Sequence, residues 1–258
     1  MIAYPDIDPV LIHIGPISIR WYGLMYLAGF TASYMLVKYQ INKKKLAVKM
    51  EDIDSLFSYC VIGLIVGARI GYIIFYNLDY YVGNPLEALV LWQGGLSFHG
   101  GLVGAVTAGA WYVKKRGLDF WTIADLVIVT APIGLGLGRL GNFINGELYG
   151  RVTDVYWGMV FPSGGPLPRH PSQLYELLFE GIVLFILLWI IKDRGLKPGS
   201  VTSFFLIFYG IFRFFIEFFR EPDVQVGYFL GFITMGQILC FIMIVSGLLI
   251  LFFRNKKR

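Results

Sequence analysis

The sequence predicts an all-α polytopic membrane protein with seven transmembrane helices. Composition is the first indication, because 57% of the 258 residues are hydrophobic and only 15% are charged, whereas roughly 25% of a soluble domain is charged. The second is a series of apolar runs long enough to cross a bilayer as helices. The third is that the alternating pattern of membrane β-strands does not occur.

The apolar runs define the expected helices. Each has about 17 to 25 residues, which is the length needed to cross the hydrocarbon core of a membrane. They lie near residues 18–37, 53–76, 96–113, 120–138, 174–191, 201–219 and 233–253. We therefore expect residues 1–258 to form a single integral membrane domain.

Lysine and arginine predict the orientation, because short loops rich in these residues stay in the cytoplasm. Every lysine and several arginines follow the first, third, fifth or seventh run, and the last of them are Lys257 and Arg258. This pattern places the N-terminus outside, the C-terminus in the cytoplasm, and residues 142–173 in a small extracytoplasmic head between helices 4 and 5. The topology explains the net charge of +5, so we expect no nucleic-acid partner.

The other cations are all arginines, and they face outward or lie within the membrane. A guanidinium can hold phosphate through two parallel hydrogen bonds and keeps its proton when buried. Arginine is also tolerated near lipid headgroups because it snorkels. The absence of lysine from this set favours an anionic headgroup as the ligand. The set is Arg20, Arg69, Arg139, Arg151, Arg169, Arg213 and Arg220.

The first two helices carry mainly packing signals. Prolines and glycines in residues 1–17 prevent a long helix there, and the first helix opens with Tyr22, either an interfacial anchor or a headgroup ligand. In the second helix, Gly63, Gly67 and Gly71 recur along one face and predict close contact with another helix. Arg69 is expected to have a structural role, paired with Asp125 or another buried carboxylate.

His99 stands among glycines at the start of the third helix, in GGLSFHGGLVG. A single histidine on an apolar face is often a satisfied core residue. A titratable group at membrane depth, with space cleared around it by glycines, favours a functional role instead. Only three histidines occur and neither HExxH nor CxxC is present, so we expect no metal and no cofactor.

The stretch GRLGNFINGELYG, residues 138–150, continues the fourth helix. Its glycines predict a broken segment of irregular backbone, which at membrane depth must line a cavity. Gly136 and Gly138 could let backbone N–H groups converge on an anion. The same stretch supplies a fixed cation, two amides and a carboxylate within nine residues: Arg139, Asn142, Asn145 and Glu147.

The fifth and sixth helices add polar groups. Ser172 and Gln173, at the start of the fifth, are expected to serve unpaired N–H groups of that helix. In the sixth, Arg213 is one turn from both Tyr209 and Glu217, so the three share a face. Arg213 and Glu217 can form an internal salt bridge, or the arginine and the tyrosine can meet a buried phosphate.

These residues offer no catalytic triad, so an enzyme built from them must take its nucleophile and leaving group from its substrates. Arginines can stabilise the charge of a departing phosphate, and a histidine can accept a proton from the nucleophile. This chemistry fits transfer of a lipid fragment from an anionic phospholipid. A transporter of an anionic solute and a non-catalytic phospholipid-binding protein are the alternatives.

Five sequence blocks carry a resemblance to a known family: RWYGLMYLAGF, GGLSFHGGLVG, GRLGNFINGELYGR, RHPSQLYE and YGIFRFFIEFFREPD. In this order and spacing they resemble the prolipoprotein diacylglyceryl transferases of bacterial membranes, over essentially the whole chain. The resemblance implies an inner-membrane enzyme whose active site faces the extracytoplasmic side. It also implies transfer of the diacylglyceryl group of phosphatidylglycerol to the lipobox cysteine of a prolipoprotein, giving a thioether and glycerol 1-phosphate as the first step of lipoprotein maturation.

The resemblance also assigns roles by position. It implies that Arg139 binds the phospholipid and that His99 and Arg213 are essential. Our own hypothesis is that His99 is the base that accepts the proton of the thiol. The lipid-binding positions that we expect beside Arg139 are Tyr22, Asn142, Asn145, Glu147, Gly150, Tyr209 and Glu217.

Overall fold

The computed structural model describes residues 2–5, 7–15, 17–91, 94–221, 228–229 and 233–256. Lys257 and Arg258, used above to predict the orientation, lie outside these ranges. The chain forms two compact units, which are described separately. The first contains Met1–Val37 and Ala124–Arg258, and the second contains Lys38–Ile123.

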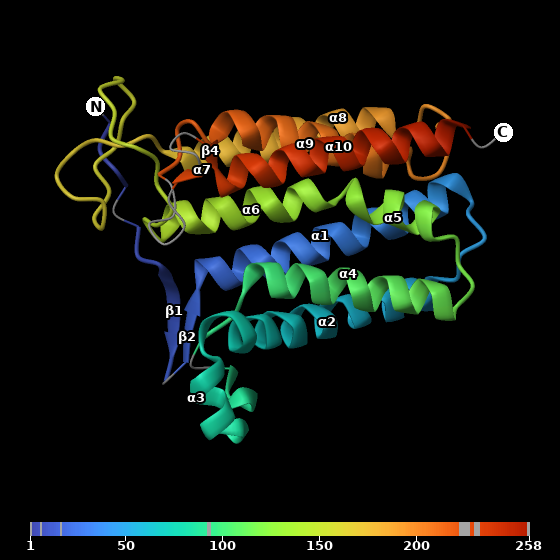
Figure 1. Cartoon of the computed structure of the whole chain (residues 1–258), viewed down its shortest axis with the longest axis horizontal. Coiled ribbons are helices and arrows are strands. Elements are labelled where there is room, and N and C mark those ends of the chain that lie inside the picture. The colour runs from blue at the N-terminus through green and yellow to red at the C-terminus, as the bar shows by residue number, and fades with distance from the viewer. Residues whose placement is uncertain are drawn as a thin grey trace. The chain divides into compact units, whose positions relative to one another are not determined.

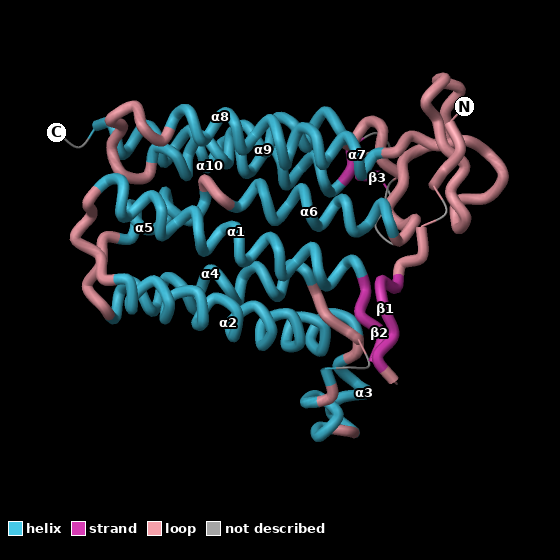
Figure 2. Tube along the Cα trace, turned by 180° about the vertical axis from the view of Figure 1, so that it is seen from behind, coloured by secondary structure: helices cyan, strands magenta, loops and turns pink. Residues whose placement is uncertain are grey.

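The first unit consists of helices and two short β-hairpins. Its elements are β1 (Val10–Ile14), β2 (Ile17–Arg20), most of α1 (Trp21–Lys44), the part of α5 (Phe120–Ile128) from Ala124 onward, α6 (Ala131–Ile144), α7 (Ser172–Glu176), the π-helix η3 (Leu177–Val183), α8 (Leu184–Ile191), α9 (Ser200–Ile216), β3 (Tyr228–Phe229), β4 (Ile233–Thr234) and α10 (Met235–Lys256). Within the unit, α9 packs along α10 (Figure 1). Helix α6 packs along η3. The loop between α6 and α7 gathers at the end of the unit where α7 begins (Figure 2).

The second unit is an antiparallel helix pair with a short helical excursion. Its elements are α2 (Met50–Tyr76), α3 (Leu78–Gly83), the 3₁₀-helix η1 (Pro85–Leu89) and α4 (Phe98–Lys115). The long helices α2 and α4 lie side by side in both views (Figures 1 and 2).

Helix occurs at each of the predicted apolar runs, which confirms a mainly helical membrane-type chain. Among the described residues, four helices are both long and apolar enough to cross a membrane: Met50–Tyr76, Phe120–Ile144, Ser172–Ile191 and Met235–Lys256. Helix α9 is apolar but shorter. The β1–β2 hairpin was not predicted. Its turn contains Gly15 at a φ of +59°, a conformation that glycine adopts without steric cost.

The predicted glycine stripe of α2 is confirmed as a helix contact. A Cβ on Gly63 would lie 2.5 Å from the carbonyl oxygen of Gly104, and one on Gly71 would lie 2.8 Å from the Cα of Gly100. Both partners are glycines of α4. The two backbones therefore approach so closely that no side chain fits between them.

Gly67→Val is expected to destabilise the second unit by about 1–3 kcal/mol, the usual cost of overpacking. The reason is that a Cβ at this position would lie 2.8 Å from the Cα of Gly104. Thermal unfolding in detergent measures the effect. Gly83→Ala is the matched control, because no described atom would lie within 4 Å of a Cβ at position 83, and equal melting temperatures for the two variants would contradict the packing account.

Arg69 has a structural role, but the carboxylate partner expected for it is wrong. Its guanidinium donates to five backbone carbonyls of residues 87–95 at 2.7–3.1 Å. The Asp125 carboxylate instead accepts from the backbone N–H groups of Gly199 and Thr202 at 2.7 and 2.8 Å, and so caps the start of α9. A guanidinium has five donors in a fixed fork, so it can satisfy a whole loop of carbonyls as readily as a carboxylate.

Candidate functional site

A buried charge cluster joins four segments of the first unit. Arg139 of α6 pairs through Nε with Oε2 of Glu176 on α7. The other oxygen of Glu176 lies 3.0 Å from Nη1 of Arg213 on α9. Arg213 also lies 2.9 Å from Glu217, just after α9, and 3.8 Å from Glu180 of η3. The structure thus confirms the Arg213–Glu217 salt bridge and brings this pair together with Arg139, which lies on a different predicted helix.

Burial differs sharply within this cluster. Glu176 is 1% exposed, Glu180 is 0% exposed and Arg213 is 8% exposed, whereas the side chain of Arg139 is 22% exposed. A buried charge is tolerated only when it is paired. Arg213 meets this condition because the carboxylates of Glu176, Glu180 and Glu217 all lie within 4 Å of its guanidinium. Arg139 is therefore the accessible cation of the cluster, and Arg213 mainly balances the buried acids.

Other polar groups surround the cluster. Tyr209 lies one turn before Arg213 on α9, and its ring stacks on that of Phe205 with the centroids 5.6 Å apart. Thr234 of β4 donates a 3.0 Å hydrogen bond from its hydroxyl to Glu217. These contacts hold the acids and the tyrosine in place around the two arginines.

Asn142, Asn145 and Glu147 form one hydrogen-bonded group beside Arg139. The Glu147 carboxylate accepts from the Asn142 amide at 2.8 Å and from the Asn145 amide at 3.0 Å. The side-chain oxygen Oδ1 of Asn142 in turn accepts from Nη1 of Arg139 at 3.5 Å. The predicted set of one cation, two amides and one carboxylate is therefore a single connected group.

The predicted irregular backbone within residues 138–150 is confirmed only for residues 145–150, because α6 continues through Arg139 and Asn142 to Ile144. Backbone N–H groups within a helix bond the preceding turn, so Gly136 and Gly138 do not form an anion-binding nest. Gly136 and Gly141 serve packing instead, whereas a Cβ on Gly138 would meet no described atom within 4 Å. A Cβ on Gly141 would lie 2.8 Å from the ring of Tyr22, which places the predicted tyrosine of α1 directly against the signature helix.

The loop after α6 is irregular and is held by side chains of α7. Gln173 donates to the carbonyl oxygen of Glu147 at 2.6 Å, and Ser172 donates to that of Leu148 at 3.1 Å. Leu148 has a φ of +57°, an uncommon value for a residue with a side chain. The expectation that Ser172 and Gln173 cap their own helix is therefore wrong, because these side chains fix the strained loop.

Gly150 is required by close packing. Its N–H donates to the carbonyl oxygen of His170 at 2.8 Å, and it bridges to Arg220. A Cβ there would lie 2.8 Å from the Cβ of His170. His170 is outside the helices, burial lowers the pKa of its imidazole, and its Nδ1 lies 3.0 Å from the hydroxyl of Tyr175. Gly150 thus shapes the loop that follows α6.

His99 belongs to the second unit, where it is the second residue of α4 and is exposed. Its ring makes an edge contact with the ring of Phe98. The neighbouring Gly100 packs against α2, so this glycine serves the contact between the two helices.

Sequence reasoning missed Glu176 and Glu180, although a signal was available. Both are carboxylates in the apolar run 172–191, and an ionisable group inside a membrane helix is a functional candidate by default. Glu180 also lies in a π-helical stretch, a feature that is frequent at functional sites. Neither oxygen of Glu180 has a hydrogen-bond partner among the described residues.

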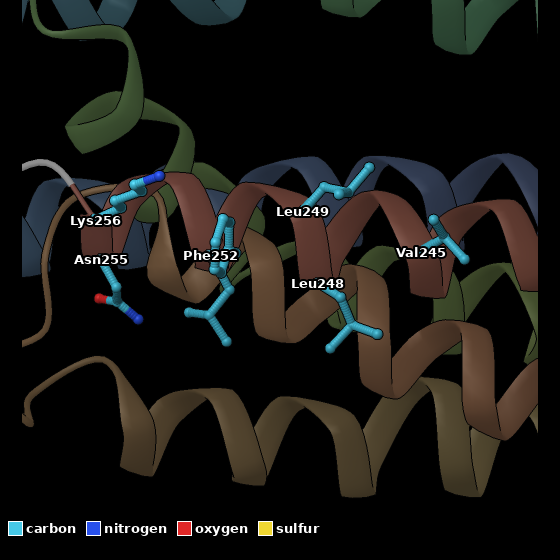
Figure 3. Close-up of a pocket in the computed structure, with 7 residues that line it drawn as sticks. Val245, Leu248, Leu249, Phe252, Asn255 and Lys256 are labelled. Carbon is cyan, nitrogen blue, oxygen red and sulfur yellow. The ribbon is translucent and has the colours of Figure 1, made fainter.

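A groove of about 700 Å³ lies along the C-terminal half of α10. Figure 3 shows Val245, Leu249 and Phe252 along this helix, with Asn255 and Lys256 at one end of the groove. None of the lining residues belongs to the charge cluster, and the walls are almost wholly apolar. The groove therefore does not explain the placement of the buried arginines.

The cluster sets two guanidinium groups against three carboxylates, those of Glu176, Glu180 and Glu217. The partly exposed guanidinium of Arg139 is therefore the part of the cluster that can meet an anion, in surroundings of low dielectric constant where charge interactions are stronger than in water. Within the described ranges, no group of three or more His, Cys, Asp and Glu side chains could hold a metal ion.

Comparison with known proteins identifies the family. Residues 9–253 match the family model described as prolipoprotein diacylglyceryl transferase. The chain is 51% identical to the phosphatidylglycerol–prolipoprotein diacylglyceryl transferase of Desulfotalea psychrophila, covering 98% of this chain and 96% of that protein. It is 53% identical to the same enzyme of Vibrio vulnificus, covering 99% and 94%. The chain therefore belongs to the prolipoprotein diacylglyceryl transferase family.

Proposed function

We propose that this protein transfers the diacylglyceryl group of phosphatidylglycerol to the cysteine thiol of a prolipoprotein lipobox. The proposal rests mainly on the pair Arg139 and Arg213, which Glu176 joins, in a chain that belongs to this family over nearly its whole length. The relatives named for this activity support the choice of both substrates.

The proposal includes a location and a topology. The protein spans the inner membrane of a bacterium seven times, with its N-terminus outside and its C-terminus in the cytoplasm. The distribution of lysine supports this orientation. Residues 142–173 form a small extracytoplasmic head, and the site opens toward that side. The small hydrophobic core of Phe143, Met159 and Phe161 supports a folded head.

In this proposal Arg139 makes the first contact with the lipid phosphate. It is the more exposed of the two arginines, and its partner Asn142 connects it to Glu147 and Asn145. Arg213 lies deeper in the cluster, where it faces the carboxylates of Glu176, Glu180 and Glu217. There it supports the contact of Arg139 with the phosphate. Tyr22, Tyr209, Gly150 and Glu217 shape the surrounding lipid site.

The chemistry balances without a cofactor. The sulfur of the lipobox cysteine attacks the diacylglyceryl carbon that is bonded to the phosphate oxygen. A C–S bond forms, the C–O bond breaks, and the electron pair leaves with glycerol 1-phosphate. The thiol, with a pKa of about 8.5 when free, loses its proton to a base. The arginines stabilise the second negative charge that develops on the departing phosphate.

His99 is the proposed base, and His99→Gln tests it. Loss of a general base costs about 10²–10⁴-fold in rate, so we expect kcat to fall in that range at pH 7. The deficit should shrink as the pH rises, because more of the thiol then ionises without help. Near-normal turnover in this variant, beside an inactive Arg139→Ala variant, would show that His99 is structural.

Transport of an anionic solute uses buried arginines as well, but transporters of this kind place paired broken helices at the binding site. Helix α6 instead runs unbroken through Arg139 and Asn142. A phospholipid-binding protein without activity would form no product.

The proposed function is tested by incubating the purified protein in detergent with phosphatidylglycerol and a peptide that contains a lipobox cysteine. We expect the peptide to gain the mass of one diacylglyceryl group while an equal amount of glycerol phosphate appears. Phosphatidylglycerol that stays bound without any adduct would support a binding protein or a transporter instead.

A further inference from the structure

Glu176 lies between the two arginines of the cluster, and its two oxygens face different guanidinium groups. One pairs with Nε of Arg139, and the other lies 3.0 Å from Nη1 of Arg213. We infer that Glu176 is a positioning residue for the reaction, which joins Arg139 and Arg213 into one anion-binding unit. This inference rests on the proposed function and adds to it a residue that makes no contact with the reacting atoms.

Electrostatics explain why such a residue is needed. Two guanidinium groups repel each other, and at low dielectric constant this repulsion is strong. A carboxylate between them replaces the repulsion with two attractive contacts. Glu180 and Glu217 approach Arg213, but among the described residues Glu176 is the carboxylate that pairs with both arginines. It therefore fixes the more exposed arginine against the buried one.

The backbone that carries Glu176 is fixed relative to the helix that carries Arg139. Gly181 of η3 packs against Gly136 of α6, and a Cβ on Gly181 would lie 2.8 Å from the Cα of Gly136. Backbones in such close contact cannot slide past each other without a clash. Glu176 is also 1% exposed, so its carboxylate cannot leave for solvent when a lipid arrives.

Phosphate can join this arrangement without displacing Glu176. A guanidinium has five N–H donors. Arg139 directs Nε toward Glu176 and makes a long contact of 3.5 Å from Nη1 to Asn142. Further donors on the same exposed group remain for phosphate oxygens, with the direction of the fork set by Glu176.

Glu176→Gln is the informative substitution. Glutamine keeps the shape of the side chain but offers one oxygen, so it can accept from only one arginine while its amide hydrogens face the other. We expect kcat/KM for phosphatidylglycerol to fall by about tenfold to a hundredfold, because misplacement of a catalytic group by about 1 Å can cost a hundredfold. KM is expected to rise or stay unchanged. Glu176→Asp keeps the charge and both oxygens and should recover at least part of the loss.

Leu184→Ala is the matched control for structural damage. Leu184 is on the same continuous helical run, is 0% exposed and packs in the hydrophobic core, so its loss should lower the melting temperature but leave KM and kcat of the folded protein unchanged. Rates are compared per amount of folded protein, so that a loss of stability alone does not register.

Three results would overturn the inference. A lower KM in Glu176→Gln would show that Glu176 competes with phosphate. Unchanged kcat and KM would show that the arginines need no bridge. Equal losses of kcat/KM in Glu176→Gln and Glu176→Asp would show that pairing through two carboxylate oxygens does not determine the activity. If the wild-type protein formed no adduct, the proposed function would fail. The bridge could then still be tested by phosphatidylglycerol binding. Weaker binding by Glu176→Gln than by the wild-type protein would support the bridge, and unchanged binding would reject it.

Discussion

Arg139→Lys is expected to lower kcat/KM for diacylglyceryl transfer by at least about a hundredfold, the usual effect of removing one donor that stabilises transition-state charge. Lysine keeps the positive charge but has no planar fork, so it cannot pair with Glu176 and hold a phosphate in two-point fashion at once. Arg139→Ala should be at least as severe. Steady-state transfer to a lipobox peptide, at saturating peptide and varied phosphatidylglycerol, measures both variants.

Arg116→Lys is a suitable control for this experiment. Arg116 is also an arginine with a carboxylate partner, since its Nε lies 2.7 Å from Asp52, but both residues belong to the second unit and lie outside the charge cluster. We expect this variant to retain most of the activity. If Arg139→Lys turned over like the wild-type protein, a simple positive charge would suffice and the fork geometry would have no role.

Arg213→Ala is expected to destabilise the protein by about 3–5 kcal/mol, because removal of one partner leaves buried charges uncompensated. Three carboxylates face this arginine, from Glu176, Glu180 and Glu217, and each is at most 6% exposed. The loss of the cation leaves all three without their common partner. Thermal or denaturant unfolding in detergent measures the change, and transfer activity should be lost with it.

The exposed pair of Lys38 and Asp54 provides the comparison. Its atoms lie 3.2 Å apart, but the two side chains are 31% and 50% exposed, and a surface salt bridge contributes only about 0–1 kcal/mol. Lys38→Ala should therefore have a small effect. An Arg213→Ala variant as stable as Lys38→Ala would mean that the buried carboxylates are protonated or solvated, and that Arg213 does not balance them.

The helices were predictable from the sequence because membrane helices are encoded in long contiguous runs. The apolar run 53–76, for example, corresponds to α2 (Met50–Tyr76). The Arg213–Glu217 pair was predictable for a similar reason, since residues four apart on a helix are neighbours. Features that depend on one continuous segment can therefore be predicted from the sequence alone.

Features that depend on contact between segments were harder to predict. Glycines in α6 suggested a broken helix, but Gly136 and Gly141 lie against η3 and Tyr22, and nothing local distinguishes a glycine that breaks a helix from one that admits a neighbour. The bridge through Glu176 needs α6, α7 and α9 to meet. The partners of Arg69 are backbone carbonyls. Every residue has one, so the sequence does not indicate which of them bind the arginine.

In the proposed reaction, the thiol sulfur forms a bond to the diacylglyceryl carbon. The bond between that carbon and the bridging oxygen breaks, so the oxygen leaves with the phosphate. The most direct test uses phosphatidylglycerol that carries a heavy-oxygen label between the diacylglyceryl carbon and phosphorus, together with the lipobox peptide and wild-type protein. Mass spectrometry should find the label entirely in the released glycerol phosphate, and an unlabelled diacylglyceryl thioether on the peptide. Label on the peptide, or a peptide that has gained phosphorus, would contradict the account, because the bond broken would then not be the carbon–oxygen bond.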